Sequence, residues 1–340
     1  MTALTMPARP GHDARLRPVP WRRMAWVTWR QHRAALAGVA VFLGALAVYL
    51  WLTGLQMHHA EAAYCHPASS LGCAINFTGR YGETAILVSI ALQAVPALIG
   101  AFIGAPVLAR ELETGTFRYA WTQGIGRLRW TVGKVVPLAV AVTAMAGAFT
   151  VLFAWYNQPW VAAGYVSPFS ARVFGLLGVA FAAWTLAAFA IGVLAGMLIR
   201  RAVPAIAASL AAYAGLAFAT ALWLRERYIA PLVTHNPSLP GSAWIISHWY
   251  TGRNGKPISQ AAISQILQAD HSATNKIGPN TSQTVLNAVG YLTQHGYTFW
   301  VSYQPGSRFW PFQWIEGGWL LVLSVLLIAA TVWLVRRRAA

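Results

Sequence analysis

The sequence predicts an all-α polytopic membrane protein with six transmembrane helices, an N-terminal interfacial helix and a small α+β domain outside the membrane. Three observations support this fold class. Six apolar stretches approach the roughly 20 residues that a helix needs to cross a bilayer. Basic residues gather beside alternate connections, and one long polar connection separates the fifth stretch from the sixth. The composition, 57% hydrophobic and 10% charged, agrees with this class.

The apolar stretches set the predicted spans. They cover Ala34–Leu55, Thr84–Ala109, Val132–Tyr156, Val173–Ile199, Ala202–Leu224 and Gly317–Val335. No acidic or basic residue lies deep inside any of them except Lys134, which is at one end of its stretch. A helix on the surface of a soluble protein would carry polar residues along one face, about once in every turn of 3.6 residues. We therefore expect these helices to lie in a membrane.

The basic residues predict the orientation. The formal net charge of +17 would indicate a nucleic-acid partner in a soluble protein. Here the arginines precede the first span, surround the second and fourth connections and follow the last span. Basic residues in short loops stay cytoplasmic, so we expect both termini inside. The excess charge then contacts anionic lipid headgroups, and no nucleic acid is expected.

The segments before and after the spans have their own character. Residues 1–19 form a Pro- and Arg-rich basic tail that we expect to be disordered. Residues 20–33 separate arginines from tryptophans on a helical wheel, which is typical of an interfacial helix. The alternative is a cytoplasmic extension of the first span. Residues 34–224 hold spans one to five, and residues 317–340 hold the sixth span and a basic C-terminus.

The first outer loop contains the two cysteines of the chain, Cys65 and Cys73. On the oxidising side of a membrane, such a pair favours a disulfide that closes a short loop. His58, His59 and His66 lie nearby and leave a zinc site as an alternative. Two free thiols are the third alternative. Spacing alone does not specify four tetrahedral ligands, so we expect no metal.

Residues 225–316 are too long for a simple connector and predict a small extracellular domain. Apolar residues at helical spacing predict one helix over Ile258–Ala269 and a second from Thr281 to Gly296. Strict alternation over Tyr297–Tyr303 predicts a strand. Aromatic residues before the sixth span are typical of an interfacial belt.

The sequence contains no recognisable catalytic motif. No G-x-x-x-x-G-K-[ST] phosphate loop is present, so the chain has no P-loop for ATP. The predicted spans lack the buried Asp, Glu or His that proton-coupled carriers use. We therefore expect no enzyme activity and no cofactor bound by this chain itself.

The second connection, residues 110–131, is the most informative polar segment. Glu111 and Glu113 are two of the three cytoplasmic acids, and they lie among basic residues at the end of the second span. Gly115 interrupts this short helix, and Thr116 can cap the next turn. The segment is either a docking element for a cytoplasmic partner or a solvated hairpin that obeys the positive-inside rule.

Polar and small residues within the second span provide further candidates. Ser89 and Gln93 lie one turn apart and are the best polar residues for lining a pathway. Intrahelical hydrogen bonding is the alternative. Gly100 and Gly104 form a small-x-x-x-small pair that permits close helix approach, as does a glycine pair in the fourth span. Such pairs serve a dimer interface or intrachain packing.

Two motifs carry a family resemblance. Ala109 to Gln123 reads A-R-E-x-E-x-G-T-x-R-x-A-W-T-Q, and Tyr303 to Glu316 reads Y-x-P-x-x-R-F-W-x-F-Q-W-I-E. Together with the layout of the spans, they resemble ABC-type exporter permeases of the family that includes the G-type half transporters. The chain is most similar to actinobacterial permease subunits, so we expect a bacterial plasma membrane.

This resemblance implies a function and partners. The second connection would be a coupling helix seated in an ATPase subunit, with its contacts at Arg110, Glu111, Glu113, Gly115, Thr116 and Arg118. A dimer of cytoplasmic ABC ATPase subunits would bind ATP and magnesium, and a second permease subunit, identical or different, would complete the pathway. The cargo would be an apolar or amphipathic drug, lipid or peptide. The rival hypothesis is a membrane scaffold or sensor whose extracellular domain binds an envelope ligand.

Overall fold

The computed structural model describes residues 21–64, 71–115, 126–162, 165–269 and 289–338. Within these ranges, six helices are long and apolar enough to cross a membrane. Their candidate spans are Ala40–Ala62, Gly79–Thr114, Arg127–Ala162, Ala180–Ile199, Ala202–Arg227 and Gly306–Arg337. The predicted six-span architecture is therefore confirmed by length and composition.

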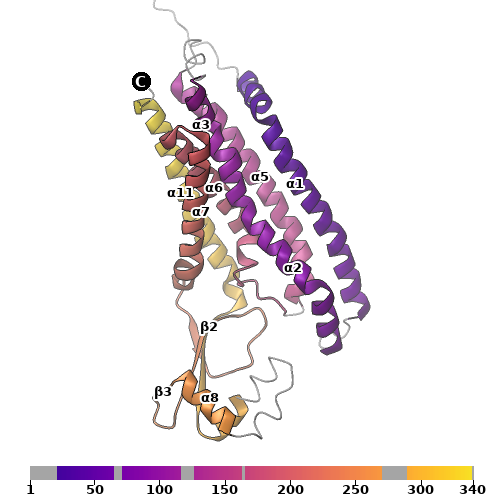
Figure 1. Cartoon of the computed structure of the whole chain (residues 1–340). Helices are drawn as coiled ribbons and strands as arrows, with labels where there is room; N and C mark the ends of the chain where they lie inside the picture. Colours follow the sequence, from indigo (N-terminus) through magenta and orange to yellow (C-terminus); the bar gives the residue numbers. More distant parts are fainter. Residues whose placement is uncertain (1–20, 65–70, 116–125, 163–164, 270–288, 339–340) are drawn as a thin grey trace, which may run out of the picture.

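The helices form one elongated bundle with a small sheet at one end (Figure 1). Its elements are α1 (Trp21–Tyr64), α2 (Leu71–Ile99), the π-helix η1 (Gly100–Gly104), α3 (Ala105–Thr114), α5 (Arg127–Ala162), α6 (Ala180–Ile199), α7 (Ala202–Ala219) and α11 (Phe309–Arg338). Helix α6 packs against α2, α3, α5, α7 and α11. It is apolar on every side, as a central helix must be.

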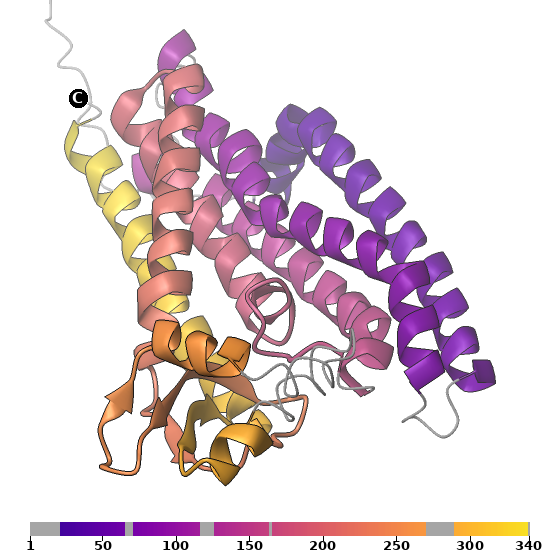
Figure 2. The ribbon, with the colours of Figure 1, turned by 60° about the horizontal axis from the view of Figure 1, so that its bottom comes forward.

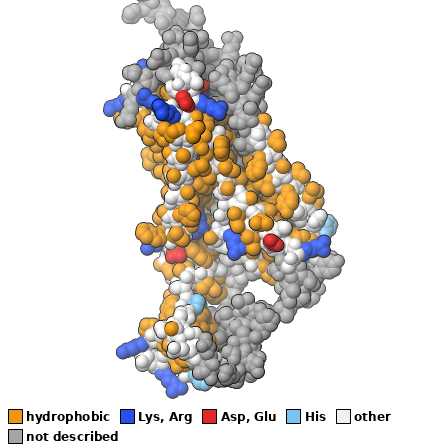
Figure 3. Space-filling view, in the orientation of Figure 1, with side chains coloured by type: hydrophobic (Ala, Val, Ile, Leu, Met, Phe, Trp, Pro, Cys, Tyr) orange, Lys and Arg blue, Asp and Glu red, His pale blue; other side chains and the backbone are white. Residues whose placement is uncertain are grey.

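The bundle surface has the polarity of a membrane protein. Hydrophobic side chains cover the middle of the face in Figure 3, and Lys and Arg lie toward the two ends of the bundle and on the sheet. Helix α1 begins, and α11 ends, at the end of the bundle opposite the sheet (Figure 1). An even number of spans requires the two ends of the chain to lie on one side.

Two boundaries differ from the predictions. The fourth helix begins at Ala180, whereas the apolar stretch begins at Val173. Residues Phe174–Leu176 form a short 3-10 turn, and Gly178 has a left-handed φ of 58°, which interrupts helical continuation. This part of the stretch is apolar because Phe174 and Leu176 are buried inside the chain. The prediction of a span from Val173 was wrong at its start.

The separate interfacial helix is not confirmed. Helix α1 runs without interruption from Trp21 to Tyr64, so its bounds match the alternative of a continuous extension of the first span. Whether its first turns lie along the membrane surface stays a prediction. The predicted basic tail, residues 1–19, lies outside the described residues.

The sheet follows the fifth span. Its antiparallel strands are arranged in the order β1-β4-β2-β3. Their bounds are Leu232–Thr234 for β1, Trp244–Thr251 for β2, Pro257–Ile258 for β3 and Thr298–Gln304 for β4. Helix α8 (Gln260–Ala269) packs on it, together with the helical residues 289–294. Figure 2 shows this domain against the ends of α7 and α11.

The predicted α+β content of this domain is confirmed in part. Helix α8 and strand β4 lie where the periodicity placed them, and the second predicted helix is described only over its last turns. Strands β1, β2 and β3 were not predicted. The domain has its own core, in which Tyr250, Phe299 and Val301 of the sheet meet Ile263 and Leu292.

Candidate functional site

The end of helix α3 is held against the start of α5. Glu111 and Lys134 form an ion pair, and both side chains are largely buried, at 17% and 8% exposed. The Lys134 ammonium also lies 4.7 Å from the centroid of the Trp130 ring. Lys134, the one basic residue inside a predicted span, therefore pairs with Glu111, an acid of the predicted coupling segment. This ion pair fastens α3 to α5.

A second contact fastens α3 to helix α7. The Glu113 carboxylate accepts a hydrogen bond of 3.1 Å from the backbone N–H of Ala202, the first residue of α7. Arg201, at the N-cap position, provides no side-chain cap of its own. A carboxylate there satisfies an orphan N–H and complements the positive end of the helix dipole. Glu113 thus caps a helix 89 residues further along the chain.

The turn that follows has the expected geometry. Gly115 ends α3 with a φ of 72° in the left-handed region, which favours glycine. Arg110 is exposed on the same short helix. Thr116 and Arg118 lie outside the described residues. The structure therefore brings together Glu111, Glu113 and Gly115, and it gives both acids partners within the chain.

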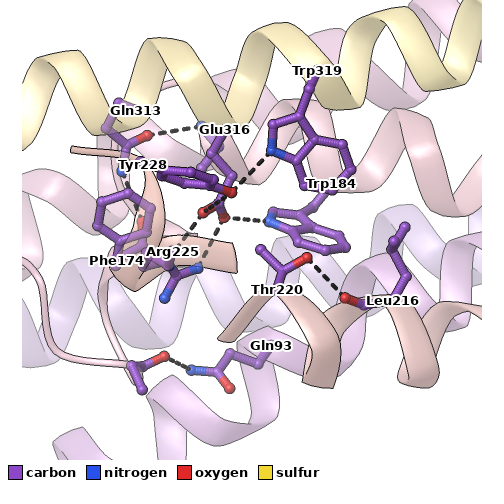
Figure 4. Close-up of polar contacts among 12 residues, drawn as sticks. Gln93, Phe174, Trp184, Leu216, Thr220, Arg225, Tyr228, Gln313, Glu316 and Trp319 are labelled. Atoms are coloured by element: carbon purple, nitrogen blue, oxygen red, sulfur yellow. Dashed lines mark hydrogen bonds and ion pairs between the residues drawn. The ribbon is translucent and has the colours of Figure 1, made fainter. Parts of the chain in front are cut away.

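The two pathway candidates have different surroundings. Ser89 is buried, and its hydroxyl donates a hydrogen bond of 2.8 Å to the carbonyl of Ala85. This is the intrahelical bonding that was the alternative to lining a pathway. Its helix face also lines a cavity of about 590 Å³. Gln93 donates to the carbonyls of Ala171 and Arg172 at 3.0 and 2.8 Å. Gln93 therefore ties α2 to the connection between α5 and α6 (Figure 4).

The glycine pairs pack against each other inside the chain. A side chain at Gly100 would overlap the carbonyl of Ala188, and one at Gly192 would overlap the carbonyl of Gly100. Gly104 likewise lies against the backbone of Phe189. Gly100 and Gly104 are buried against α6. This packing is of the kind that the intrachain alternative describes, and the dimer contact stays a prediction.

The predicted cysteine pair falls partly outside the described residues. Cys65 lies outside the described residues, so the disulfide stays a prediction. His58, one of the three nearby histidines, contacts the carbonyl of Trp155 at 3.1 Å and stacks on its ring. Among the residues that the structure describes, no group of three or more His, Cys, Asp or Glu side chains is placed to hold a metal.

A buried charge cluster at the sheet end of the bundle was missed by the sequence reasoning. Glu316 on α11 is fully buried, and Arg225, after the fifth helix, is 6% exposed. The arginine pairs with both carboxylate oxygens, at 2.9 and 3.0 Å. Trp184 Nε1 donates to the same carboxylate at 2.8 Å, and the Tyr228 hydroxyl does so at 3.3 Å (Figure 4).

Further groups complete this cluster. Trp319 Nε1 donates to the Tyr228 hydroxyl at 2.9 Å, and the Arg225 guanidinium lies 4.2 Å from the centroid of the Phe174 ring. Burial, and then the nearby Glu316 charge, raise the pKa of Tyr228, so this hydroxyl keeps its proton. Arg225, Trp184 and Tyr228 all donate to one carboxylate. The cluster therefore joins α6, α11 and the segment after α7.

Gln313 on α11 fixes the start of the central helix. Its side-chain oxygen accepts from the Ala180 N–H at 3.0 Å, and its amide donates to the Phe174 carbonyl at 2.9 Å. It thereby supplies the N-terminal cap that Val179 does not. Gln313 and Glu316 both belong to the second motif, which was interpreted as an interfacial entry. The sequence did contain one signal for this cluster, which is an acid and an amide that lie one turn apart among apolar residues.

The described spans are also less free of charge than predicted. Arg225 and Glu316 fall within the fifth and sixth candidate spans, and Arg80 and Glu83 fall near the start of the second. Apart from the start at Val173, the apolar stretches lie within the helices, but the helices extend beyond several of them. Ionisable residues at such depth are functional candidates or structural pairs.

Comparison with known families supports the interpretation of the bundle as the membrane part of a transporter. A family model described as ABC-2 membrane transporter related matches residues 39–225, more than half of the chain. This range covers the first four candidate spans, most of the fifth and residues 110–131, and it ends at Arg225. No curated protein and no solved structure matches the chain.

Proposed function

Because the chain belongs to the ABC-2 membrane transporter related family, and is therefore the membrane subunit of a transporter, we propose that it is the permease of an ATP-driven exporter. Its cargo would be an apolar or amphipathic compound such as a drug, a lipid or a peptide. Two cytoplasmic ATPase subunits would bind ATP and magnesium. A second permease subunit, identical or different, would complete the pathway.

The observation that carries this proposal is the anchoring of α3 at two points. Glu111 pairs with Lys134 of α5, and Glu113 caps α7 at Ala202. The chain then turns at Gly115, directly before the segment 116–125. A partner that binds this end of α3 and moves it would displace α5 and α7 with it. A coupling helix needs such contacts to transmit the movement of an ATPase subunit to the spans.

Alternating access would use these contacts. Helix α3 continues through the π-helix η1 into α2, and η1 packs closely on α6 at Gly100 and Gly104. A displacement of α3 would thus be passed to the central helix through backbone contacts that cannot compress. ATP-driven closure of the partner subunits would supply the displacement. The bundle would then open toward the side that carries the sheet.

The scaffold or sensor hypothesis is supported by a separate observation. The sheet domain has its own core, and Leu232, Val233 and Ile245 on its strands are exposed. Such a surface is suited to an envelope ligand whether or not the bundle transports. Stimulated ATP hydrolysis separates the two hypotheses, because a scaffold predicts none.

The test combines the full chain with an ATPase subunit, to be sought among the genes beside its own. Arg110→Glu reverses an exposed charge at the proposed interface, and Gly115→Val strains a left-handed turn. We expect each change to weaken co-purification about tenfold or more, which is about 1.4 kcal/mol. ATP hydrolysis in proteoliposomes should fall in parallel.

The matched control is Lys256→Glu, the same charge reversal on an exposed residue of the sheet domain. It should leave binding and hydrolysis unchanged. Glu113 is a poor probe by itself, because its substitution also removes the cap of α7. Wild-type binding and hydrolysis in both Arg110→Glu and Gly115→Val would overturn the coupling role of this segment.

A further inference from the structure

A cavity of about 590 Å³ lies at the sheet end of the bundle, between the first half of α2, the end of α5 and the connection to α6. Its size falls in the range of small-molecule sites. Its polar lining includes Glu83, Asn157, Ser170 and Arg172. None of these residues belongs to the Glu316 cluster or to the coupling segment.

The cavity contains a buried amide that lacks a partner. Asn157 is 5% exposed, yet its Nδ2 makes no hydrogen bond with any described residue. The Ser170 hydroxyl, also on the cavity wall, is buried and unsatisfied in the same way. Leaving such a group unpaired is unfavourable, because it loses its hydrogen bonds to water without gaining others. A ligand that accepts a hydrogen bond from Asn157 would remove this cost.

Opposite charges line the same cavity. Glu83 and Arg172 are both exposed, and neither forms an ion pair with any residue in the described part of the chain. One carboxylate and one guanidinium without mutual contact present separate sites for an ammonium and for an anion. Guanidinium groups bind phosphate well through paired N–H donors. The lining therefore matches a zwitterion better than a singly charged ligand.

The apolar surroundings indicate an amphiphile. Ile86 on the cavity wall is 41% exposed on the outer face of α2. Asn157 also lines a second cavity, of about 760 Å³, whose walls include Val151, Ala154 and Phe309. The cavity that contains the two charged side chains thus adjoins a more apolar one, and Asn157 lines both. This arrangement suits a headgroup followed by hydrocarbon.

Aromatic residues place the first cavity at headgroup depth. Trp160 and Tyr165 line it and meet edge to face, with ring centroids 6.3 Å apart. Glu83 lies four residues after Gly79, where the second candidate span begins. Tryptophan and tyrosine are enriched at this level of a membrane. Indole rings also attract ammonium groups.

We propose that this cavity binds a phospholipid with a zwitterionic amine headgroup, of the phosphatidylethanolamine class. Glu83 receives the ammonium, Arg172 pairs with the phosphate, and Asn157 Nδ2 donates to a phosphate or ester oxygen. That this lipid class is also the transported cargo rests on the proposed function. The binding itself is a property of the isolated chain.

The test measures lipid binding to the purified full chain in an uncharged detergent. The probes are dihexanoyl phosphatidylethanolamine, dihexanoyl phosphatidylglycerol, which lacks the amine, and glycerophosphoethanolamine, which lacks the acyl chains. We expect the first to bind at least tenfold more tightly than the other two. Equal binding of the two lipids would contradict the requirement for a zwitterionic headgroup. Binding of glycerophosphoethanolamine as tight as that of dihexanoyl phosphatidylethanolamine would contradict a lipid ligand and indicate a soluble compound.

Substitutions assign the roles. Glu83→Gln should abolish the preference for phosphatidylethanolamine over phosphatidylglycerol, and Arg172→Gln should weaken both at least tenfold. Glu226→Gln and Arg227→Gln are the matched controls, since both residues are exposed and lie outside the cavity. A retained preference in Glu83→Gln would overturn the assignment of the ammonium.

Asn157→Leu separates binding from folding. It removes an unpaired buried amide, so its thermal midpoint should equal or exceed that of the wild type while lipid affinity falls at least tenfold. Wild-type affinity in Asn157→Leu would overturn the role of this amide. Lipid binding without stimulated ATP hydrolysis would refute the transport function alone, and the converse result would refute the lipid site alone.

Discussion

At the scale of single residues, Glu316 is a fully buried carboxylate with partners from three side chains. A buried carboxylate is costly unless its oxygens are fully paired. Arg225, Trp184 and Tyr228 supply four donors to its two oxygens. The pair therefore holds the end of the fifth span to the sixth. Its value lies in defining one arrangement of these helices, since burial of both charges offsets much of their attraction.

Removal of one partner should be far more damaging than removal of both. We predict that Glu316→Gln, which leaves Arg225 buried without a counter-charge, lowers the free energy of unfolding by about 3–5 kcal/mol. The double variant Glu316→Met with Arg225→Met should recover most of this loss. Thermal unfolding followed by size-exclusion chromatography in detergent measures both. Glu226→Gln, an exposed acid next to Arg225, is the control.

The cysteine pair provides a second prediction at this scale. Cys65 and Cys73 lie in the connection between α1 and α2 and at the start of α2. If this connection faces the oxidising side, mass spectrometry of unreduced protein should find one intrachain link between them. Two thiols that react with an alkylating reagent in freshly purified, unreduced protein would contradict the disulfide.

At the scale of helices, backbone contact between α6 and the second span determines the packing. The π-helix η1 closes with a bond from the Ala105 N–H to the Gly100 carbonyl, and Pro106 follows directly. Proline lacks the N–H of a regular helix, so the π turn lies where helical bonding is already interrupted. Single-turn π-helices of this kind are frequent at functional sites.

This packing can be tested by adding a single methyl group. Gly192→Ala would place a Cβ against the Gly100 carbonyl, which cannot move without displacing the helix. We expect a loss of about 1–3 kcal/mol in the free energy of unfolding, as for other overpacked cores. Gly44→Ala is the matched control, because nothing lies within 4 Å of a Cβ at this position of α1. It should be neutral or slightly stabilising. Equal stability of the two variants would contradict the tight contact.

The sequence predicts these elements unevenly, for physical reasons. Apolar runs locate the spans because hydrophobic length is a local property. Strand β4 and helix α8 follow from local periodicity in the same way. The Glu113 cap and the Glu316 cluster could not be predicted, because their partners lie 89 and 91 residues away and no local pattern relates them. The apolar residues at Val173–Leu177 were misassigned because burial inside the protein and burial in lipid select the same residue types.

At the scale of the molecule, the chain has two chemically different ends. One end holds the end of α3, the start of α1 and the end of α11, and the other holds the sheet (Figure 1). The Glu316 cluster lies toward the sheet, since the neighbouring Phe312 and Phe174 pack with Trp244 of β2. The α3 anchors and the cavity lie at opposite ends of α2 and its continuation. In the proposed function, ATP hydrolysis would act at one end and the lipid would bind at the other, and the second span connects the two.

The orientation of these ends is the last prediction. Arginines cluster around residues 110–131 and at the Arg200–Arg201 turn, so the positive-inside rule places these turns in the cytoplasm and the sheet outside. In a background with Cys65→Ser and Cys73→Ser, single cysteines at Arg200 and Asn254 report on the two ends, because both positions are exposed. A membrane-impermeant maleimide should label Asn254→Cys in intact cells, and Arg200→Cys only after the membrane is permeabilised. Labelling of both in intact cells would contradict the six-span orientation, since these two positions are separated by the fifth span alone.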